Sequence, residues 1–186
     1  RIALNAVLPA DIVVKYAQIV SPEFHARHSA IGKRYRYLIY NLPYRAVFSR
    51  NQSWWVNQKL DIKRMEEAAG VLIGEHDFSA FRAASCSSPN PVKNMREILI
   101  AKTLLSNSTL QIEIEANSFL QHMVRIITGT LVEVGQGRKN IDDVAEALKS
   151  GKRKLAGITA PAHGLYSLNV IYPQGMIKWP LEVIDN

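Results

Sequence analysis

The sequence predicts an α+β fold, in which a mostly antiparallel mixed sheet is flanked by helices. Residues 34–40 and 109–115 alternate apolar and polar side chains with the period of two that is expected of a half-buried strand. Residues 62–73 and 118–134 instead repeat apolar side chains at helical spacing. Because strands and helices do not alternate regularly along the chain, the order favours α+β over a parallel α/β class.

The first half of the chain is expected to supply two strands and one helix. Apolar residues predict a strand over Ile12–Val20, which Pro22 ends because proline disrupts a ladder. The second strand, Arg34–Tyr40, is rich in β-forming residues. Asp61 is a suitable N-cap for the helix that follows, and Gly74 closes that helix.

The second half is expected to supply a loop, a hairpin, two helices and a last strand. Side chains typical of caps and turns separate these elements. In order, we expect a loop at 76–81, a hairpin of Arg96–Thr103 with Thr109–Glu115 around a turn at Ser106–Ser108, a helix from Asn117 or Ser118 to Val134, a short helix from Asp142, and a strand from Leu165 to Tyr172.

The composition is that of a globular protein. Of the 186 residues, 47% are hydrophobic and 21% are charged, which excludes a disordered chain. The single cysteine, Cys86, excludes an internal disulfide and a thiolate zinc cluster. The first segment lacks the pattern of a signal peptide and no apolar run reaches about 18 residues, so we expect no signal peptide, no membrane partner and a cytoplasmic location. The first residue is Arg1 and not methionine, which suggests a fragment of a longer protein.

The formal net charge of +7 is less informative than its distribution. Residues 24–60 contain no acidic residue, seven basic residues and eight of the fifteen aromatic side chains. Basic groups contact phosphates and aromatic faces stack on unpaired bases, so this stretch predicts RNA binding. The alternative is a sheet with an aromatic inner face and basic side chains outside. Further acid-free stretches extend the candidate nucleic-acid-binding set, which is Arg27, Lys33, Arg34, Arg36, Arg82 and Lys93.

The sequence offers little for metal, nucleotide or hydrolase chemistry, and we expect neither a metal nor a cofactor. His25 and His28 have a spacing that a metal site can use, but an extended segment would place them on opposite faces. The glycines of 135–137 follow a helix, whereas a phosphate-binding loop follows a strand. Asp77 is interpreted as the N-cap of a short turn, and Cys86 as an inert residue.

Arg125 is the most unusual charged residue. It lies within a predicted helix with apolar neighbours on both sides. Its guanidinium either extends to solvent at a helix edge or is buried and requires a carboxylate or phosphate. The sequence leaves both alternatives open.

Five motifs occur in order along the chain: FHARHSA at 24–30, KRYRY at 33–37, HDFSAFR at 76–82, NSFLQHMVR at 117–125 and APAHGLY at 160–166. In this order and spacing they resemble the TruA-type tRNA pseudouridine synthases. The resemblance covers nearly the whole chain, including Leu4–Asp11, which looks like the N-x-x-L-P-x-D-I segment of that family.

The resemblance implies a pseudouridine synthase-like fold and a homodimer that isomerises uridine in the tRNA anticodon stem-loop, at tRNA positions 38–40, without a cofactor. In that family an aspartate attacks the nucleotide while the glycosidic bond is cleaved, and the uracil rejoins through C5. By position, Tyr35 resembles the tyrosine that stacks on the target base and assists proton removal at C5. Arg125 resembles the basic partner of the aspartate, and Leu165 the apolar floor of the pocket.

The family's aspartate lies in a G-R-T-D-A-G-V-H loop, which does not occur in these residues. The resemblance therefore implies that residues 1–22 are a remnant of the N-terminal, aspartate-bearing domain. Residues 23–186 would be the C-terminal α+β domain, with the active-site Tyr and Arg and an RNA-binding face, and the chain alone would be inactive. The alternatives are an RNA-binding domain or catalytically dead paralogue, and a structural protein with a basic surface.

Overall fold

The computed structural model describes residues 1–103 and 106–178. The chain divides into two compact units. One unit contains Arg1–Ile31 and the segment that starts at Tyr172, and the other is Gly32–Ile171. The expected domain boundary between residues 22 and 23 does not coincide with these units, and its meaning as a domain remnant stays a prediction.

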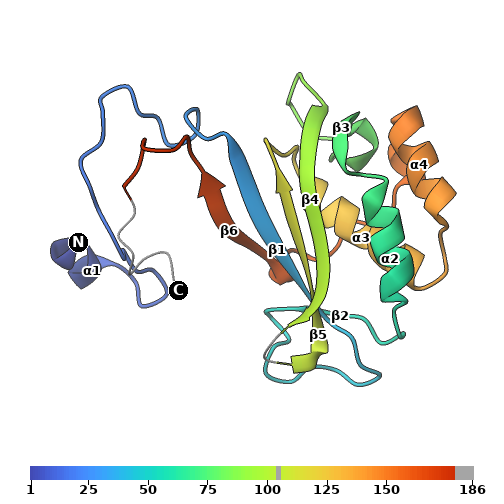
Figure 1. Cartoon of the computed structure of the whole chain (residues 1–186). Coiled ribbons are helices and arrows are strands. Elements are labelled where there is room, and N and C mark those ends of the chain that lie inside the picture. The colour runs from blue at the N-terminus through green and yellow to red at the C-terminus, as the bar shows by residue number, and fades with distance from the viewer. Residues whose placement is uncertain (104–105, 179–186) are drawn as a thin grey trace. The chain divides into compact units, whose positions relative to one another are not determined.

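The larger unit is built on one six-stranded sheet (Figure 1). All strand pairs are antiparallel except β1 with β2, which confirms the mostly antiparallel mixed sheet. Along the sheet the order is β2-β1-β5-β4-β3, and β6 pairs with β1. The strands are β1 Gly32–Tyr40, β2 Trp54–Trp55, β3 Gly74–Asp77, β4 Val92–Thr103, β5 Ser106–Ala116 and β6 Leu165–Ile171.

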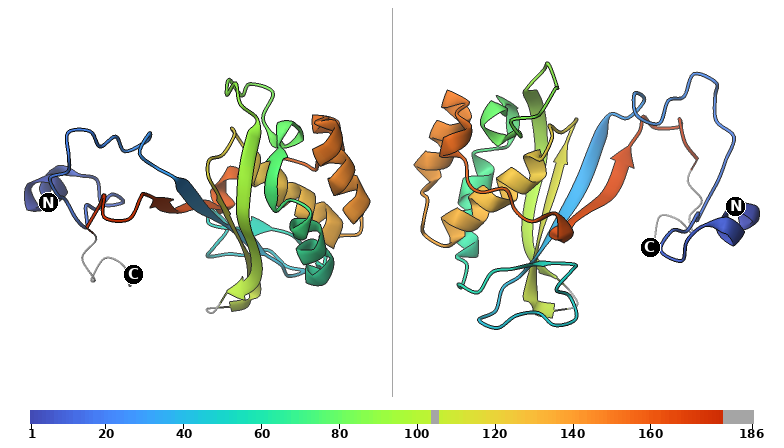
Figure 2. Two further views of the ribbon diagram at one scale, coloured as in Figure 1. Left: turned by 45° about the horizontal axis from the view of Figure 1, so that its top comes forward. Right: turned by 180° about the vertical axis from the view of Figure 1, so that it is seen from behind.

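Three helices lie on one face of this sheet, as the views in Figures 1 and 2 show. They are α2 (Ile62–Gly70), α3 (Met123–Gly135) and α4 (Ile141–Ser150). Most of α3 is buried, because apolar residues surround its axis and it packs against both β1 and α2. Three short 3-10 helices lie in the connections: η1 (Ser79–Phe81), η2 (Arg153–Leu155) and η3 (Ala162–Gly164).

The Asp61 cap predicted for α2 is confirmed, and α4 is capped by residues that the sequence reasoning did not select. The Asp61 side chain accepts a hydrogen bond from the Arg64 amide and so caps α2, although this helix ends at Gly70, earlier than expected. Asn140 and Asp143 form a reciprocal capping box at the start of α4. The residue after α4, Gly151, is left-handed and ends the helix.

The expected strand over Ile12–Val20 is wrong. The smaller unit contains a short helix, α1 (Ile2–Val7), followed by extended chain that pairs with no strand among the described residues. Instead, the Asn5 side chain binds both backbone groups of Val14, at 2.8 and 3.1 Å. Apolar β-forming residues alone do not make a strand when no neighbouring strand pairs with them.

Two further boundaries differ from expectation. The helix expected from 117 or 118 begins only at Met123, because His122 is left-handed (φ 61°) and interrupts a continuous helix. Residues 76–81, expected as loop, contain the end of β3 and then η1. The hairpin is confirmed as β4–β5, but the expected turn residues 106–108 already belong to β5, and 104–105 lie outside the described residues. No described helix is long and apolar enough to cross a membrane.

Candidate active site

A pocket of about 220 Å³ brings together the three residues expected at the active site. It lies where the first half of β1, the start of α3 and the start of β6 meet. The wall is mostly apolar, with one guanidinium, one phenol and one imidazole. Its lining residues are Tyr35, Phe119, Leu120, His122, Met123, Val124, Arg125, Ala162 and Leu165.

Tyr35 is positioned by the centre of the sheet. On β1 it lies between Ile114 of β5 and Ser167 of β6. Its ring meets the Phe119 ring edge-on, with centroids 5.1 Å apart and planes at 88°. The Tyr35 hydroxyl has no hydrogen-bond partner among the residues that the structure describes. A half-buried phenol is therefore presented to the pocket with its hydroxyl available.

Arg125 lies in the first turn of α3 and is anchored by backbone. Its Nε donates to the Ala160 carbonyl at 2.6 Å, and the Ala160 amide donates to the Arg125 carbonyl at 3.1 Å. It forms no ion pair with any carboxylate of residues 1–103 or 106–178. The guanidinium is partly buried, which lies between the two alternatives; it is held by backbone and has no carboxylate partner in the described chain.

The pocket wall that contains Ala162 and Leu165 rests on Tyr37. The Tyr37 hydroxyl donates to the Pro161 carbonyl at 2.6 Å. A methyl group at Gly164 would lie 2.7 Å from the Tyr37 ring, so only glycine permits this close approach. Burial raises the pKa of Tyr37 far above its ordinary value, opposed in part by the charge of Arg125, so this hydroxyl remains a donor.

The segment before this wall is seated directly on α3. The Gly157 amide donates to Thr130 Oγ1 at 2.8 Å, and the Ile158 amide donates to Glu133 Oε1 at 3.3 Å. The Ile158 carbonyl lies against Gly129, where a Cβ would overlap it. Together with the Arg125–Ala160 bonds, these contacts make one seam that fixes the wall relative to the guanidinium.

His122 and Phe119 also line the pocket, although the sequence reasoning did not select them. His122 holds the left-handed conformation immediately before α3, and backbone strain in a non-glycine residue often marks a functional position. Both residues lie inside the motif at 117–125. The motif was the only signal, since neither residue has an unusual spacing.

The basic residues Arg34 and Arg36 are neutralised within the sheet. Arg34 contacts Glu97 at 2.6 Å, Glu115 at 2.9 Å and Glu113 at 3.4 Å. Arg36 contacts Glu113 at 2.7 Å. These carboxylates come from β5, which pairs with β1, and from β4, the next strand of the sheet, although both strands are distant from β1 in sequence. The role of Arg34 and Arg36 in RNA binding stays a prediction, whereas their ion pairs support a structural role within the sheet.

We therefore expect Arg34→Gln to lower the free energy of unfolding by about 1 kcal/mol, because Arg34 bridges three carboxylates on a partly exposed face. The loss should shrink in 1 M salt, where such pairs are screened. Urea unfolding at low and high salt measures both. The matched control is Arg27→Gln, whose side chain is exposed in the smaller unit. Equal loss in both variants would contradict the bridging role.

The other candidate RNA-binding residues differ widely in exposure. Arg27 is exposed, and Lys33 is half-buried on β1. Lys93 is only 7% exposed and donates to the Asn90 carbonyl at 2.7 Å. Arg82 is half-buried and reaches the Ser88 carbonyl at 3.4 Å. On this geometry Arg27 is the most accessible of the four.

The aromatic residues of the acid-free stretch divide between the two interpretations. Tyr37 is fully buried beneath the sheet, as the sheet interpretation requires. Tyr44 and Phe48, in contrast, are 65% and 99% exposed in the loop before β2, where Arg45 lies 5.1 Å above the Trp55 ring. The stretch therefore supplies both core and an exposed basic, aromatic surface.

The expectation that His25 and His28 lie on opposite faces is wrong. Their rings are 4.3 Å apart, because the segment turns and is not extended. His25 Nδ1 accepts hydrogen bonds from the amides of Arg27 and His28, at 3.1 and 3.2 Å. No group of three or more potential metal-ligating His, Cys, Asp or Glu residues occurs in the described part of the chain.

Two other residues weighed for chemistry have local structural explanations. Asp77 Oδ1 accepts a hydrogen bond from the Ser79 amide at 2.7 Å, so it stabilises the local turn that leads into η1, although the N-cap position itself is Phe78. Cys86 is half-buried, and hydrogen bonds from the backbone of Ser88 and Gln121 lower the pKa of its thiol. Neither residue lines the pocket.

Comparison with known proteins gives one consistent result. A family model described as tRNA pseudouridine synthase matches residues 68–173. A protein of Acetivibrio thermocellus named tRNA pseudouridine synthase A is 45% identical over 170 residues, which are 91% of this chain and 68% of that relative. The protein of that name from Hydrogenovibrio crunogenus is 42% identical over 98% of this chain and 68% of its own length. The protein of that name from Pseudomonas aeruginosa is 44% identical over 91% of this chain and 58% of its own length.

Proposed function

This chain belongs to the tRNA pseudouridine synthase family, and from that premise we propose that it forms the Tyr35–Arg125 side of an active site that isomerises uridine to pseudouridine in tRNA. The observation that carries the proposal is the pocket in which Tyr35, Arg125 and Leu165 meet. The finer assignments, the anticodon stem-loop, a homodimer and the cytoplasm, belong to the same proposal.

In the proposed reaction the bond from C1′ to N1 of uridine breaks and a bond from C1′ to C5 forms, with no gain or loss of atoms. A proton leaves C5 and N1 gains one. The Tyr35 hydroxyl, unpaired among the described residues, would assist at C5, while Leu165 supports the flat face of the base.

Arg125 would hold the nucleophilic aspartate ionised and oriented, because a guanidinium in a mostly apolar pocket favours a paired carboxylate. That aspartate has no counterpart among the Asp residues of this sequence. We therefore propose that it comes from outside these 186 residues.

Tyr35→Phe, made in the full-length protein, tests the assignment. We expect pseudouridine formation to be abolished, since only the hydroxyl is removed and the edge contact with Phe119 remains. Binding of tRNA should stay within a few fold of wild type. Pseudouridine is measured by chemical modification and primer extension, and binding by filter retention.

The matched control is Tyr172→Phe, which removes a hydroxyl that donates to the Ala26 carbonyl outside the pocket. Product formation by this control should persist. Full activity of Tyr35→Phe would remove Tyr35 from the chemistry. If the unmodified full-length protein bound tRNA and formed no pseudouridine, the alternative, an RNA-binding module, would be correct.

A further inference from the structure

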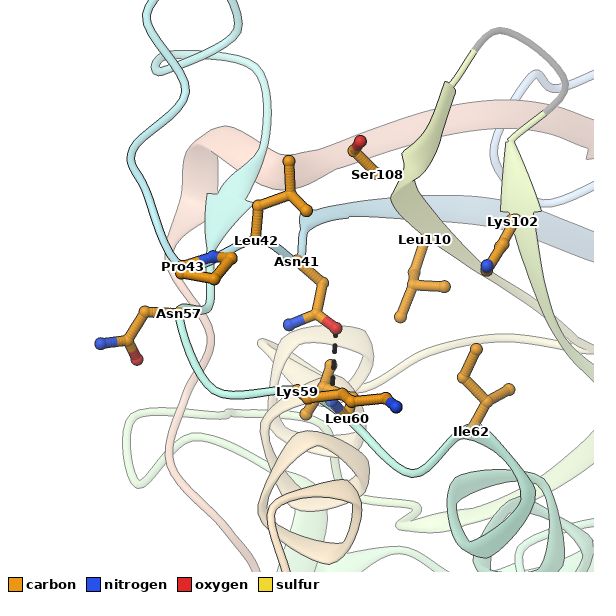
Figure 3. A pocket seen from close by; sticks show the side chains of 10 residues that line it. All are labelled: Asn41, Leu42, Pro43, Asn57, Lys59, Leu60, Ile62, Lys102, Ser108 and Leu110. Atoms are coloured by element: carbon orange, nitrogen blue, oxygen red, sulfur yellow. Dashed lines mark hydrogen bonds between the residues drawn. The ribbon is translucent and has the colours of Figure 1, made fainter.

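A second, larger pocket of about 390 Å³ is shown in Figure 3. It begins with Asn41, directly after the last residue of β1, whereas Tyr35 lies in the first half of that strand. Residues that follow β1, the loop before α2 and the β4–β5 hairpin line it. Its volume is in the range of small-molecule sites. None of the pocket residues of the proposed active site contributes to it.

The walls of this pocket are fixed before any ligand binds. Asn41 Nδ2 donates to the carbonyls of Val56 and Gln58, at 2.9 and 2.7 Å, and Asn41 Oδ1 accepts from the Leu60 amide at 3.3 Å. Leu60 and Leu110 are 5% and 3% exposed and form part of an apolar floor. The side-chain amide of Asn41 therefore bonds to the backbone of the wall, and other groups must recognise a ligand.

Two lysines supply the charge. Lys59 and Lys102 come from different segments, and in Figure 3 their side chains approach the pocket from different sides. Within residues 1–103 and 106–178, neither ammonium group has a hydrogen bond or an ion pair. None of the lining residues is acidic. Two cations beside an apolar floor favour an anion that carries an apolar or planar body.

We propose that this pocket binds a phosphate-bearing nucleotide, with the phosphate between Lys59 and Lys102 and the nucleoside against Leu110 and Ile62. Ammonium groups contact phosphate as point charges, and an apolar surface accommodates the flat face of a base. The nucleotide is either a unit of a bound RNA strand or a free nucleotide. Only the assignment to RNA rests on the function proposed above.

The test uses the full-length protein, the double variant Lys59→Gln/Lys102→Gln and the charge-matched control Lys149→Gln/Lys154→Gln, whose two lysines are exposed away from the pocket. Uridine 5′-monophosphate and uridine are titrated separately and followed by amide chemical shifts. Unmodified tRNA is bound at several salt concentrations.

We expect uridine 5′-monophosphate, and not uridine, to shift the amides of residues 41–42, 59–62 and 102 in the wild type and the control, but not in the double variant. We expect tRNA binding by the double variant to weaken several fold, with a salt slope shallower by about one, as for one lost phosphate contact.

The two probes separate the sources of the phosphate. If the double variant loses nucleotide binding but binds tRNA as the control does, the pocket is a free-nucleotide site. If the double variant binds tRNA more weakly but its nucleotide binding is unchanged, the pocket is an RNA subsite. If neither probe distinguishes the double variant from its control, the proposal is overturned. Both readouts measure binding, so a protein that fails to isomerise uridine leaves this result intact, and failure here leaves the isomerisation untouched.

Discussion

Arg125→Lys is expected to lower kcat/KM for pseudouridine formation by a factor on the order of 100 or more, the size observed when one preorganised electrostatic group is lost. Lysine keeps the charge but lacks the Nε–H that donates to the Ala160 carbonyl and the planar fork that holds a carboxylate at two points. The positive charge would remain near the pocket, but the hydrogen bonds that orient the guanidinium and the carboxylate would be lost. Single-turnover rates with full-length protein and tRNA measure the effect.

The control for this experiment is Arg153→Lys. Arg153 also donates to backbone, at the Gly157 carbonyl at 2.8 Å, but it does not line the pocket. We expect Arg153→Lys to lower the free energy of unfolding slightly and to keep its activity within a few fold of wild type. Equal loss of activity in both variants would mean that Arg125 acts only by holding the loop, and near-wild-type activity of Arg125→Lys would remove it from the site.

The sequence predicted most of the framework because the relevant signals are local. The period of two over 34–40 and the helical spacing before Gly70 and Gly135 are each confined to one element. Arg125 was likewise visible as a charge within an apolar helix. In each case the side-chain pattern itself requires one face to be buried, so the structure follows from neighbouring residues.

The sequence could not show what β1 lies against. Residues 24–60 contain no acid, yet Arg34 meets Glu97 and Glu115, which are 63 and 81 positions away. Strand pairing brings these residues together, and a pattern read from neighbouring positions in the sequence does not reveal which strands pair. The late start of α3 has a similar cause: residues 118–121 carry a helical pattern, but the left-handed His122 prevents a continuous helix.

The seam between α3 and residues 157–160 could not be predicted from local sequence patterns either. The substitution Gly129→Ala tests it. In the middle of a helix this change normally stabilises by about 1 kcal/mol. Here the new Cβ would overlap the Ile158 carbonyl, which is backbone and cannot rotate away. We expect a net loss of about 1–3 kcal/mol in the free energy of unfolding, the usual range for overpacking. Urea unfolding of the full-length protein measures it.

Gly70→Ala is the matched control, because a Cβ at this helical glycine would meet no atom within 4 Å. Its stability should be unchanged or raised by up to about 1 kcal/mol. Gly129→Ala should also slow pseudouridine formation, because relieving the overlap moves Ile158, and the seam continues from there to Ala160 and the Arg125 guanidinium. Similar stability of the two variants would show that α3 and this segment are not in close contact, and the wall would then need another support.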